Sequence, residues 1–179
     1  MPTEYRFFCP ELQREVSTAE CYDRGDTGRA CYGECCAHVE QAVLTIAQTR
    51  LQAQFGERIT TEYCEDDAML VIRFHEHLTL EAFYDPLQRT VDFDVYLGVT
   101  HGHQFPAEDA DGLVRIVGQL MNGDAAFVVQ PNGLFPGSLC LASRDELAAN
   151  WRRYTRGRRT KIIDGRGMFD KDASGYCPG

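Results

Sequence analysis

The sequence contains no long apolar run. Its longest uninterrupted hydrophobic stretch is too short to cross a bilayer, so we expect no transmembrane helix and no membrane partner. The N-terminal residues lack the apolar segment and small-residue cleavage site of a secretory signal, which predicts a cytoplasmic protein. The chain has 179 residues, of which 44% are hydrophobic and 25% charged. This ordinary globular composition excludes a disordered or low-complexity protein and suits one domain, with or without an appendage.

Familiar catalytic motifs are also missing. The sequence has no P-loop, no dinucleotide-binding glycine pattern, no paired-histidine zinc-protease motif and no nucleophile-elbow serine. A catalytic cysteine–histidine pair would meet only in the fold, and eight cysteines with five histidines make a chance pairing easy. We therefore favour a non-enzymatic role over catalysis.

Basic residues are scarce through most of the chain. Residues 1–150 hold ten Arg and Lys against 24 Asp and Glu, a net charge of −14, whereas residues 151–179 hold eight against three, a net charge of +5. The acidic body predicts a basic protein partner, such as a toxin or a secreted effector. The basic tail predicts nucleic-acid contacts through phosphate binding and base stacking, unless it folds back on the acidic body. Six of its eight cationic residues lie within residues 151–161; they are Arg152, Arg153, Arg156, Arg158, Arg159 and Lys161.

Hydrophobic periodicity predicts three helices. The first covers about residues 36–55, where apolar residues recur at every fourth position, and Gly56 ends it. The second covers about residues 109–122, with Asp109 as its N-cap and Gly123 as its stop. The sequence from Ser143 to Glu146 is typical of a capping box and predicts a third helix over about residues 144–155.

Alternating apolar residues predict the strands. Their expected ranges are 3–8, 58–64, 69–75, 78–84, 90–100, 125–130, 138–142 and 160–163. A hairpin that pairs residue 84 with residue 89 places Leu80 opposite Phe93 and Phe74 opposite Val99 on one buried face, and a slip by one residue would expose one of these sets.

The expected fold is α+β, with an antiparallel sheet, two or three packed helices and an N-terminal cysteine-rich loop held by zinc. Three segments are predicted. Residues 1–35 form a cysteine-rich strand and loop packed on the body, residues 36–156 form the α+β domain, and residues 157–179 form a basic tail. The order of elements over about residues 36–155 is similar to that of secretion-chaperone-like folds, a resemblance of topology alone.

Five of the eight cysteines lie within the first 36 residues. Residues 10–34 show no sustained period, and a loop of that length inside a compact domain needs something to hold it. Four thiolates satisfy the tetrahedral preference of zinc, so we expect one structural zinc ion. Reduced buried thiols and, less favoured, a disulfide are the alternatives. The expected ligands are Cys9, Cys21, Cys31 and either Cys35 or Cys36, with His38 as a possible substitute.

Two pairs of histidines have the spacing of residues that point the same way on a strand. His101 and His103 lie where the strand over 90–100 is expected to pass into a loop, and they are the candidates for a second metal, as in a metal-dependent enzyme. His75 and His77 are expected on the outer face of the sheet. Solvated or locally hydrogen-bonded histidines are the simpler interpretation of both pairs.

Acidic residues gather on the outer face of the predicted sheet and in its turns. Such a surface suits an inhibitor, an immunity protein or a chaperone that binds a basic partner. A merely solvated face is the alternative interpretation. The candidate partner-binding residues are Glu65, Asp66, Asp67, Glu76, Glu81, Asp92 and Asp94.

Overall fold

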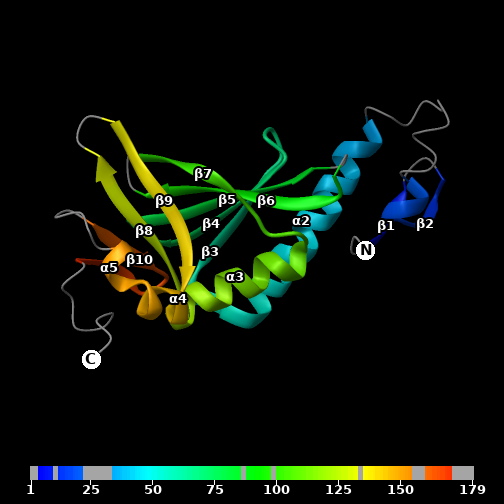
Figure 1. Cartoon of the computed structure of the whole chain (residues 1–179). Coiled ribbons are helices and arrows are strands. Elements are labelled where there is room, and N and C mark those ends of the chain that lie inside the picture. The colour runs from blue at the N-terminus through cyan, green and yellow to red at the C-terminus, as the bar shows by residue number, and fades with distance from the viewer. Residues whose placement is uncertain are drawn as a thin grey trace. The chain divides into compact units, whose positions relative to one another are not determined.

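The computed structural model of the protein describes residues 4–9, 12–21, 34–85, 88–97, 100–132, 135–154 and 160–170. They form an α+β fold, as predicted (Figure 1). The helices are α2 (Glu34–Phe55), α3 (Ala110–Asn122), α4 (Arg144–Ala149) and α5 (Trp151–Tyr154), with a 3-10 turn η1 (Gly56–Arg58). The strands are β1 (Arg6–Cys9), β2 (Arg14–Ser17), β3 (Thr60–Cys64), β4 (Met69–His75), β5 (Leu78–Asp85), β6 (Thr90–Leu97), β7 (Thr100–Pro106), β8 (Ala125–Asn132), β9 (Phe135–Ser143), β10 (Lys161–Asp164) and β11 (Gly167–Asp170).

The strands form three sheets. One has two strands, β1 and β2; one has four, in the order β11-β10-β8-β9; and one has five, in the order β3-β4-β5-β6-β7. In the five-stranded sheet the spatial order follows the chain order, which is the pattern of a meander with short connections. No helix within the described ranges combines the length and the apolar character that crossing a bilayer requires.

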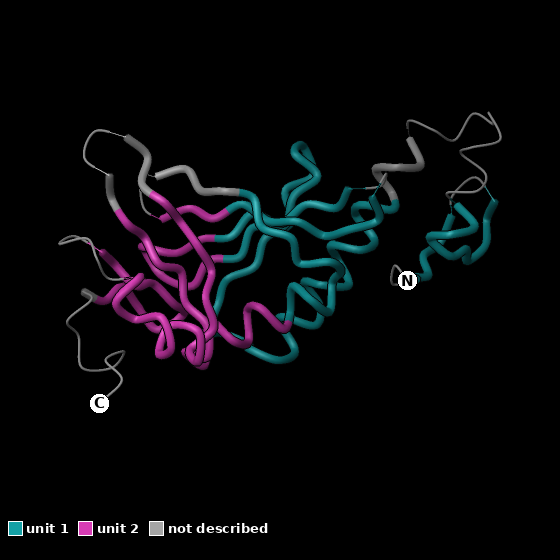
Figure 2. Tube along the Cα trace, viewed as in Figure 1, with its two compact units in different colours: residues 1–72, 80–94, 104–114 teal, residues 73–79, 95–103, 115–179 magenta. Residues whose placement is uncertain are grey.

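The chain divides into two compact units, which Figure 2 colours separately. Unit 1 comprises residues 1–72, 80–94 and 104–114, and unit 2 comprises residues 73–79, 95–103 and 115–179. Four strands of the meander, β4 to β7, and helix α3 therefore contribute residues to both units. The predicted division into 1–35, 36–156 and 157–179 stays a prediction.

Unit 1 has a core between α2 and the inner residues of the meander. The predicted helix over 36–55 is confirmed, and its expected stripe is buried together with Leu44. Buried and half-buried residues alternate along all of β5 and along β6 up to Tyr96, with Leu80 and Phe93 both fully buried. The predicted facing of these two strands is therefore confirmed, because a slip by one residue would have inverted one pattern.

The N-terminal hairpin was not anticipated in full. Residues 10–34 were expected to lack structure, but β2 pairs with β1 in antiparallel register, with Phe7 opposite Val16. The first strand matches the one predicted over 3–8, whereas β2 buries only Val16 and is too short to give a periodic signal. Tyr5 anchors the hairpin to α3, because its hydroxyl accepts a 2.8 Å hydrogen bond from the backbone N–H of Ala110.

Unit 2 is built around the β8–β9 hairpin. In it Val128 lies opposite Cys140 and Ala125 lies opposite Ser143. Strand β10 pairs with the other side of β8, and β11 pairs with β10. A small core joins these strands to α4 and α5; it consists of Ala126, Val128, Ala142, Leu147 and Ile162, with Cys140, Trp151 and Tyr154 packed against it.

Three predicted elements need correction. The strand expected over 90–100 ends at Leu97, and a separate strand, β7, follows from Thr100. The third helix is interrupted at Asn150, although the predicted cap is present, since Ser143 Oγ accepts a hydrogen bond from the Glu146 N–H at 3.2 Å. The tail supplies the predicted strand as β10 and an unpredicted one, β11, whose pairing depends on β10 rather than on its own sequence. Because β7 is separate, five strands lie between α2 and α3, rather than the four predicted.

Candidate functional site

Carboxylates lie on the outer face of the meander in unit 1. Along β6, Asp92 and Asp94 are half-buried and alternate with the fully buried residues Val91, Phe93 and Val95. This alternation directs the two carboxylates away from the core, as predicted. Asp85, the last residue of β5, is likewise half-buried and lies at an outward position of its strand.

These carboxylates affect one another. Burial, followed by the charges of Asp85 and Asp94, raises the pKa of Asp92, while a hydrogen bond from the Gln104 amide to Asp92 Oδ2 at 3.3 Å opposes the rise. Burial and the charge of Asp85 raise the pKa of Glu40 on α2. A charge that raises the pKa of a neighbouring carboxyl lies close enough for its field to reach that group.

Tyr63 on β3 links Glu40 to a further carboxylate, Glu65. Burial raises the pKa of Tyr63, and the charges of Glu40 and Glu65 add to the rise. Helix α2, the β3–β4 turn and strands β5 and β6 thus supply one connected set of charges. We call this set the acidic surface; it consists of Glu40, Glu65, Asp85, Asp92 and Asp94.

The other predicted acidic residues have separate places. Asp66 and Asp67 are exposed beside Glu65 in the β3–β4 turn, and Glu81 is half-buried on β5. Glu76 belongs to unit 2, where its carboxylate lies 3.2 Å from His77 Nε2 in the β4–β5 turn. Partner binding by any of these residues stays a prediction.

Sequence reasoning missed Glu40 and Asp85. Glu40 lies between the apolar positions of α2, where a charged residue is normally read as solvated. Asp85 belongs to a turn, in which the N–H groups of Gln88 and Arg89 donate to its side chain and carbonyl at 3.1 and 2.7 Å. Glu40 comes near Asp85 only through tertiary packing, so no local pattern could have shown its place.

The predicted zinc ligands fall only partly within the described residues. Cys9 ends β1 and is buried, and Cys21 is half-buried at the end of a single helical turn over residues 18–21. Cys31 lies outside the described residues, as do the side chains of Cys35, Cys36 and His38, whose backbone forms the first turns of α2. Among the side chains that are described, no group of three or more His, Cys, Asp or Glu could hold a metal ion.

The histidine pairs lie in different surroundings from those expected. His101 and His103 are within strand β7 rather than at a strand-to-loop exit, and their side chains are outside the described part of the structure. His75 has a defined geometry in unit 2. Its Nδ1 accepts the His77 backbone N–H at 3.2 Å, so its Nε2–H donates to the Asp164 carbonyl at 2.7 Å. With both ring nitrogens engaged, His75 is poorly placed to bind a metal.

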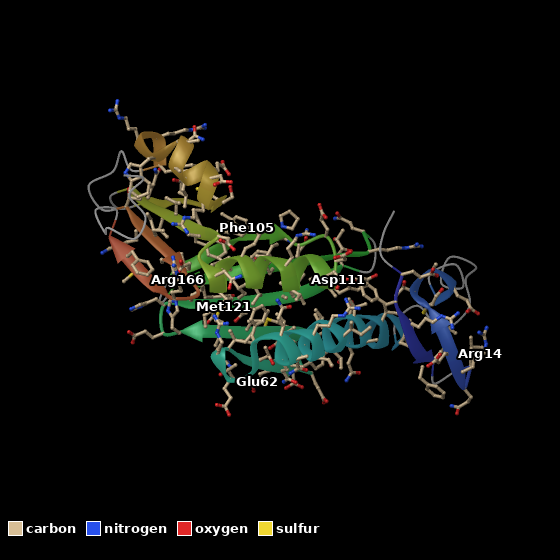
Figure 3. The ribbon with its side chains drawn as sticks, turned by 90° about the horizontal axis from the view of Figure 1, so that it is seen from below. Arg14, Glu62, Phe105, Asp111, Met121 and Arg166 are labelled. Carbon is tan, nitrogen blue, oxygen red and sulfur yellow. The ribbon has the colours of Figure 1, made fainter. Side chains whose placement is uncertain are left out.

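The β10–β11 turn is the most tightly built polar feature of unit 2. Asp164 is fully buried, and the Arg166 guanidinium donates to its Oδ2 from Nε at 2.9 Å and from Nη2 at 2.7 Å. The turn rests on the end of α3, because Gly165 N donates to the Leu120 carbonyl at 3.0 Å (Figure 3). Gly123 lies directly under the guanidinium. These contacts hold the β10–β11 turn in place, and we interpret them as structural rather than catalytic.

Only some of the predicted nucleic-acid-binding residues lie within the described part of the structure. Arg152 and Arg153 are exposed on α5, and Lys161 is half-buried in β10. Arg156, Arg158 and Arg159 lie outside the described residues.

Comparison with models of protein families, with curated proteins and with solved structures gave no match in any of the three searches. The function therefore has to be argued from the chemistry of the described surfaces.

Proposed function

We propose that the protein is a non-enzymatic binding module that holds a basic protein partner on its acidic surface, in the manner of an inhibitor, an immunity protein or a chaperone. The effect of the Asp85 charge on two neighbouring carboxyls carries the proposal. Asp85 raises the pKa of both Asp92 and Glu40, so the surface holds repelling charges at neutral pH. A cationic partner would relieve this repulsion and gain attraction at the same time.

The sheet around these carboxylates supports a protein partner rather than a small cation. Half-buried Phe83 lies on the outer face of β5 with Asp85. Aromatic residues beside charges are typical of protein interfaces, where they supply apolar contact area. A peptide with alternating lysine and apolar residues has the matching chemistry.

The test uses two fluorescent probes, a short peptide of alternating lysine and leucine and a DNA duplex. We expect the full chain to bind the peptide with an affinity that falls steeply as salt is added, because exposed charges are screened beyond about 10 Å at 0.1 M salt. Asp92→Lys combined with Asp94→Lys should slow association most, since charge complementarity acts mainly on the on-rate.

A matched control separates the acidic surface from net charge. Glu15→Lys combined with Glu57→Lys makes the same change in net charge at two exposed residues elsewhere in unit 1. Peptide binding that ignores the double reversal on β6, or that falls equally in the control, would contradict the proposal. Binding of the DNA instead, lost on Arg152→Ser with Arg153→Ser, would support a nucleic-acid role. These point changes replace deletion of the tail, because β10 buries Ile162 and Ile163 in unit 2.

The proposal includes one structural zinc ion, bound by Cys9, Cys21, Cys31 and either Cys35 or Cys36. Its support is the buried thiol of Cys9 and the place of Cys35 and Cys36 in the first turn of α2, where the helix N-terminus favours a thiolate. Elemental analysis of protein purified without chelator should give one zinc per chain, and Cys21→Ser should release it and loosen the N-terminal segment. Metal-free wild-type protein with the same fold would contradict this part.

A further inference from the structure

Strand β9 occupies one edge of the four-stranded sheet of unit 2. From Ser138 to Ser143 it pairs with β8 in regular antiparallel register, and the bulge of this hairpin lies nearer its tip. Alternate residues of an edge strand direct their backbone N–H and C=O groups away from the sheet. In the part of the chain that the structure describes, no second strand pairs with these outward groups of β9.

As far as the described residues show, this edge lacks the usual protection against strand addition. Natural proteins shield long edges with charged residues, prolines, short strands or a covering element. The segment from Ser138 to Ser143 has no charged residue and no proline, and its central residues Leu139, Cys140 and Leu141 are only half-buried. The opposite edge strand, β11, has four residues against nine in β9. The β9 edge therefore offers both hydrogen bonds and apolar side chains to an incoming strand.

We propose that two copies of the chain associate through β9, antiparallel about a twofold axis at Cys140, and so join two four-stranded sheets into one. In this register Leu139 lies opposite the partner's Leu141, and Ser138 lies opposite the partner's Ala142. Pro136 then falls beyond the ladder, opposite the residue that begins α4. A register centred on Leu139 would set Pro136, which has no N–H, opposite Ala142 inside the ladder.

The sequence of β9 favours a second copy over a different protein. A twofold interface brings each residue against its own symmetry-related set, so it must be self-complementary. Here every pair is apolar or small, and no like charges face each other. The basic partner proposed above would find no opposite charge along this edge, so the two surfaces serve different contacts.

The first test measures the mass of the full chain in solution by sedimentation over a wide range of concentration. We expect a reversible dimer. Leu139→Lys should weaken dimerisation by about tenfold or more, because two cross-strand apolar pairs are lost and a charge enters the edge. Ala148→Lys adds the same charge at an exposed position of α4 and should leave the dimer intact.

Adding Leu141→Glu to Leu139→Lys gives a register-specific rescue. In the proposed register each new lysine faces a glutamate of the other copy, so the double variant should regain the dimer. A monomer at every concentration would overturn the proposal, as would a Leu139→Lys protein that dimerises like the wild type. A folded single variant that is monomeric, without rescue in the double variant, would overturn the register.

The second test uses the wild-type chain, so it does not depend on any variant folding. Directly opposed residues have Cβ atoms about 4.5–5.5 Å apart, close to the span of a disulfide. Oxidation with diamide should therefore link the two Cys140 thiols, which pass two electrons and two protons to the diamide. Burial raises the pKa of Cys140, so the reaction is run at alkaline pH.

Trypsin gives a direct readout of this link. The fragment from Ile116 to Arg144 contains Cys140 as its only cysteine, so a disulfide-linked dimer of this fragment identifies the proposed contact. Cys140→Ser should abolish it. Oxidised wild-type dimer from which the linked fragment is absent would contradict the twofold axis at Cys140.

Discussion

Arg166 neutralises the fully buried carboxylate of Asp164 with two guanidinium N–H groups on one oxygen, while its own backbone N–H donates to the other at 2.8 Å. The carbonyl of the same aspartate accepts the Nε2–H of His75. A two-residue turn thus satisfies a buried charge and links the end of β10 to β4. Because a buried carboxylate is costly when unpaired, this turn should dominate the stability of unit 2.

Removal of the Arg166 side chain should be strongly destabilising. We expect Arg166→Ala to lower the free energy of unfolding by about 2 kcal/mol, less than for a fully buried pair because the Arg166 side chain is 44% exposed. Urea unfolding followed by circular dichroism measures the change. Arg152→Ala, at an exposed arginine of α5, is the control and should change little. Equal effects of the two substitutions would show that the Arg166–Asp164 pair adds nothing to the free energy of unfolding beyond what an exposed arginine adds.

Gly123 should tolerate no side chain, for two reasons that can be separated. Its φ is +74°, and an added Cβ would lie 2.2 Å from Arg166 Cζ. Gly56 has a φ of +54° and open space around it. Gly56→Ala therefore measures only the cost of a positive φ for a residue with a Cβ, about 1–2 kcal/mol of unfolding free energy. Gly123→Ala should cost that amount and also displace Arg166. In the Arg166→Ala background the extra loss should disappear, which a double-mutant cycle of unfolding free energies would detect.

His75 should carry its proton on Nε2 at neutral pH. Its Nδ1 is the acceptor for the His77 N–H, which excludes the other neutral tautomer. Nitrogen-15 chemical shifts of the imidazole identify the tautomer directly. Added zinc should leave the His75 signals unchanged, since both ring nitrogens are engaged. A proton on Nδ1, or a zinc-dependent shift of these signals, would contradict the described geometry.

Glu40→Gln should stabilise the protein at neutral pH. Burial and the charge of Asp85 raise the folded-state pKa of Glu40 above its unfolded value, so the ionised carboxylate costs stability once the pH exceeds both. We expect a gain of at most about 0.5 kcal/mol at pH 7, as is usual for a surface position. The gain should vanish below about pH 4, where the carboxyl is protonated in both states. Urea unfolding at both pH values tests this, with the exposed Glu57→Gln as control.

The first two helices and the facing of β5 and β6 are predictable because their signals are local. The apolar stripe of α2 and the alternating burial of β5 and β6 each depend on the residues of a single segment. The caps were also correct: Gly112 N donates to Asp109 Oδ1 at 2.7 Å, and Gly123 has the positive φ of a helix stop. Such features need no knowledge of what lies across the fold.

The remaining elements depend on contacts between distant residues. Strands β2 and β11 have only four residues each and are defined by their partners. The same reason limited the candidate surface. Asp92 and Asp94 could be placed from their own strand, whereas Glu40 comes near Asp85 only when α2 has packed against the meander.

The place of β10 has a consequence for synthesis on the ribosome. Unit 1 draws on no residue beyond 114, but the β8 strand of unit 2 needs β10, which follows 29 residues after β8 ends at Asn132. At translation rates of about 5–20 residues per second, β8 would wait roughly one to six seconds for its neighbour. During that interval the nascent chain holds a hairpin with an unpaired apolar edge, a species that is prone to aggregate. Nascent-chain folding should therefore proceed in two stages, with unit 1 first.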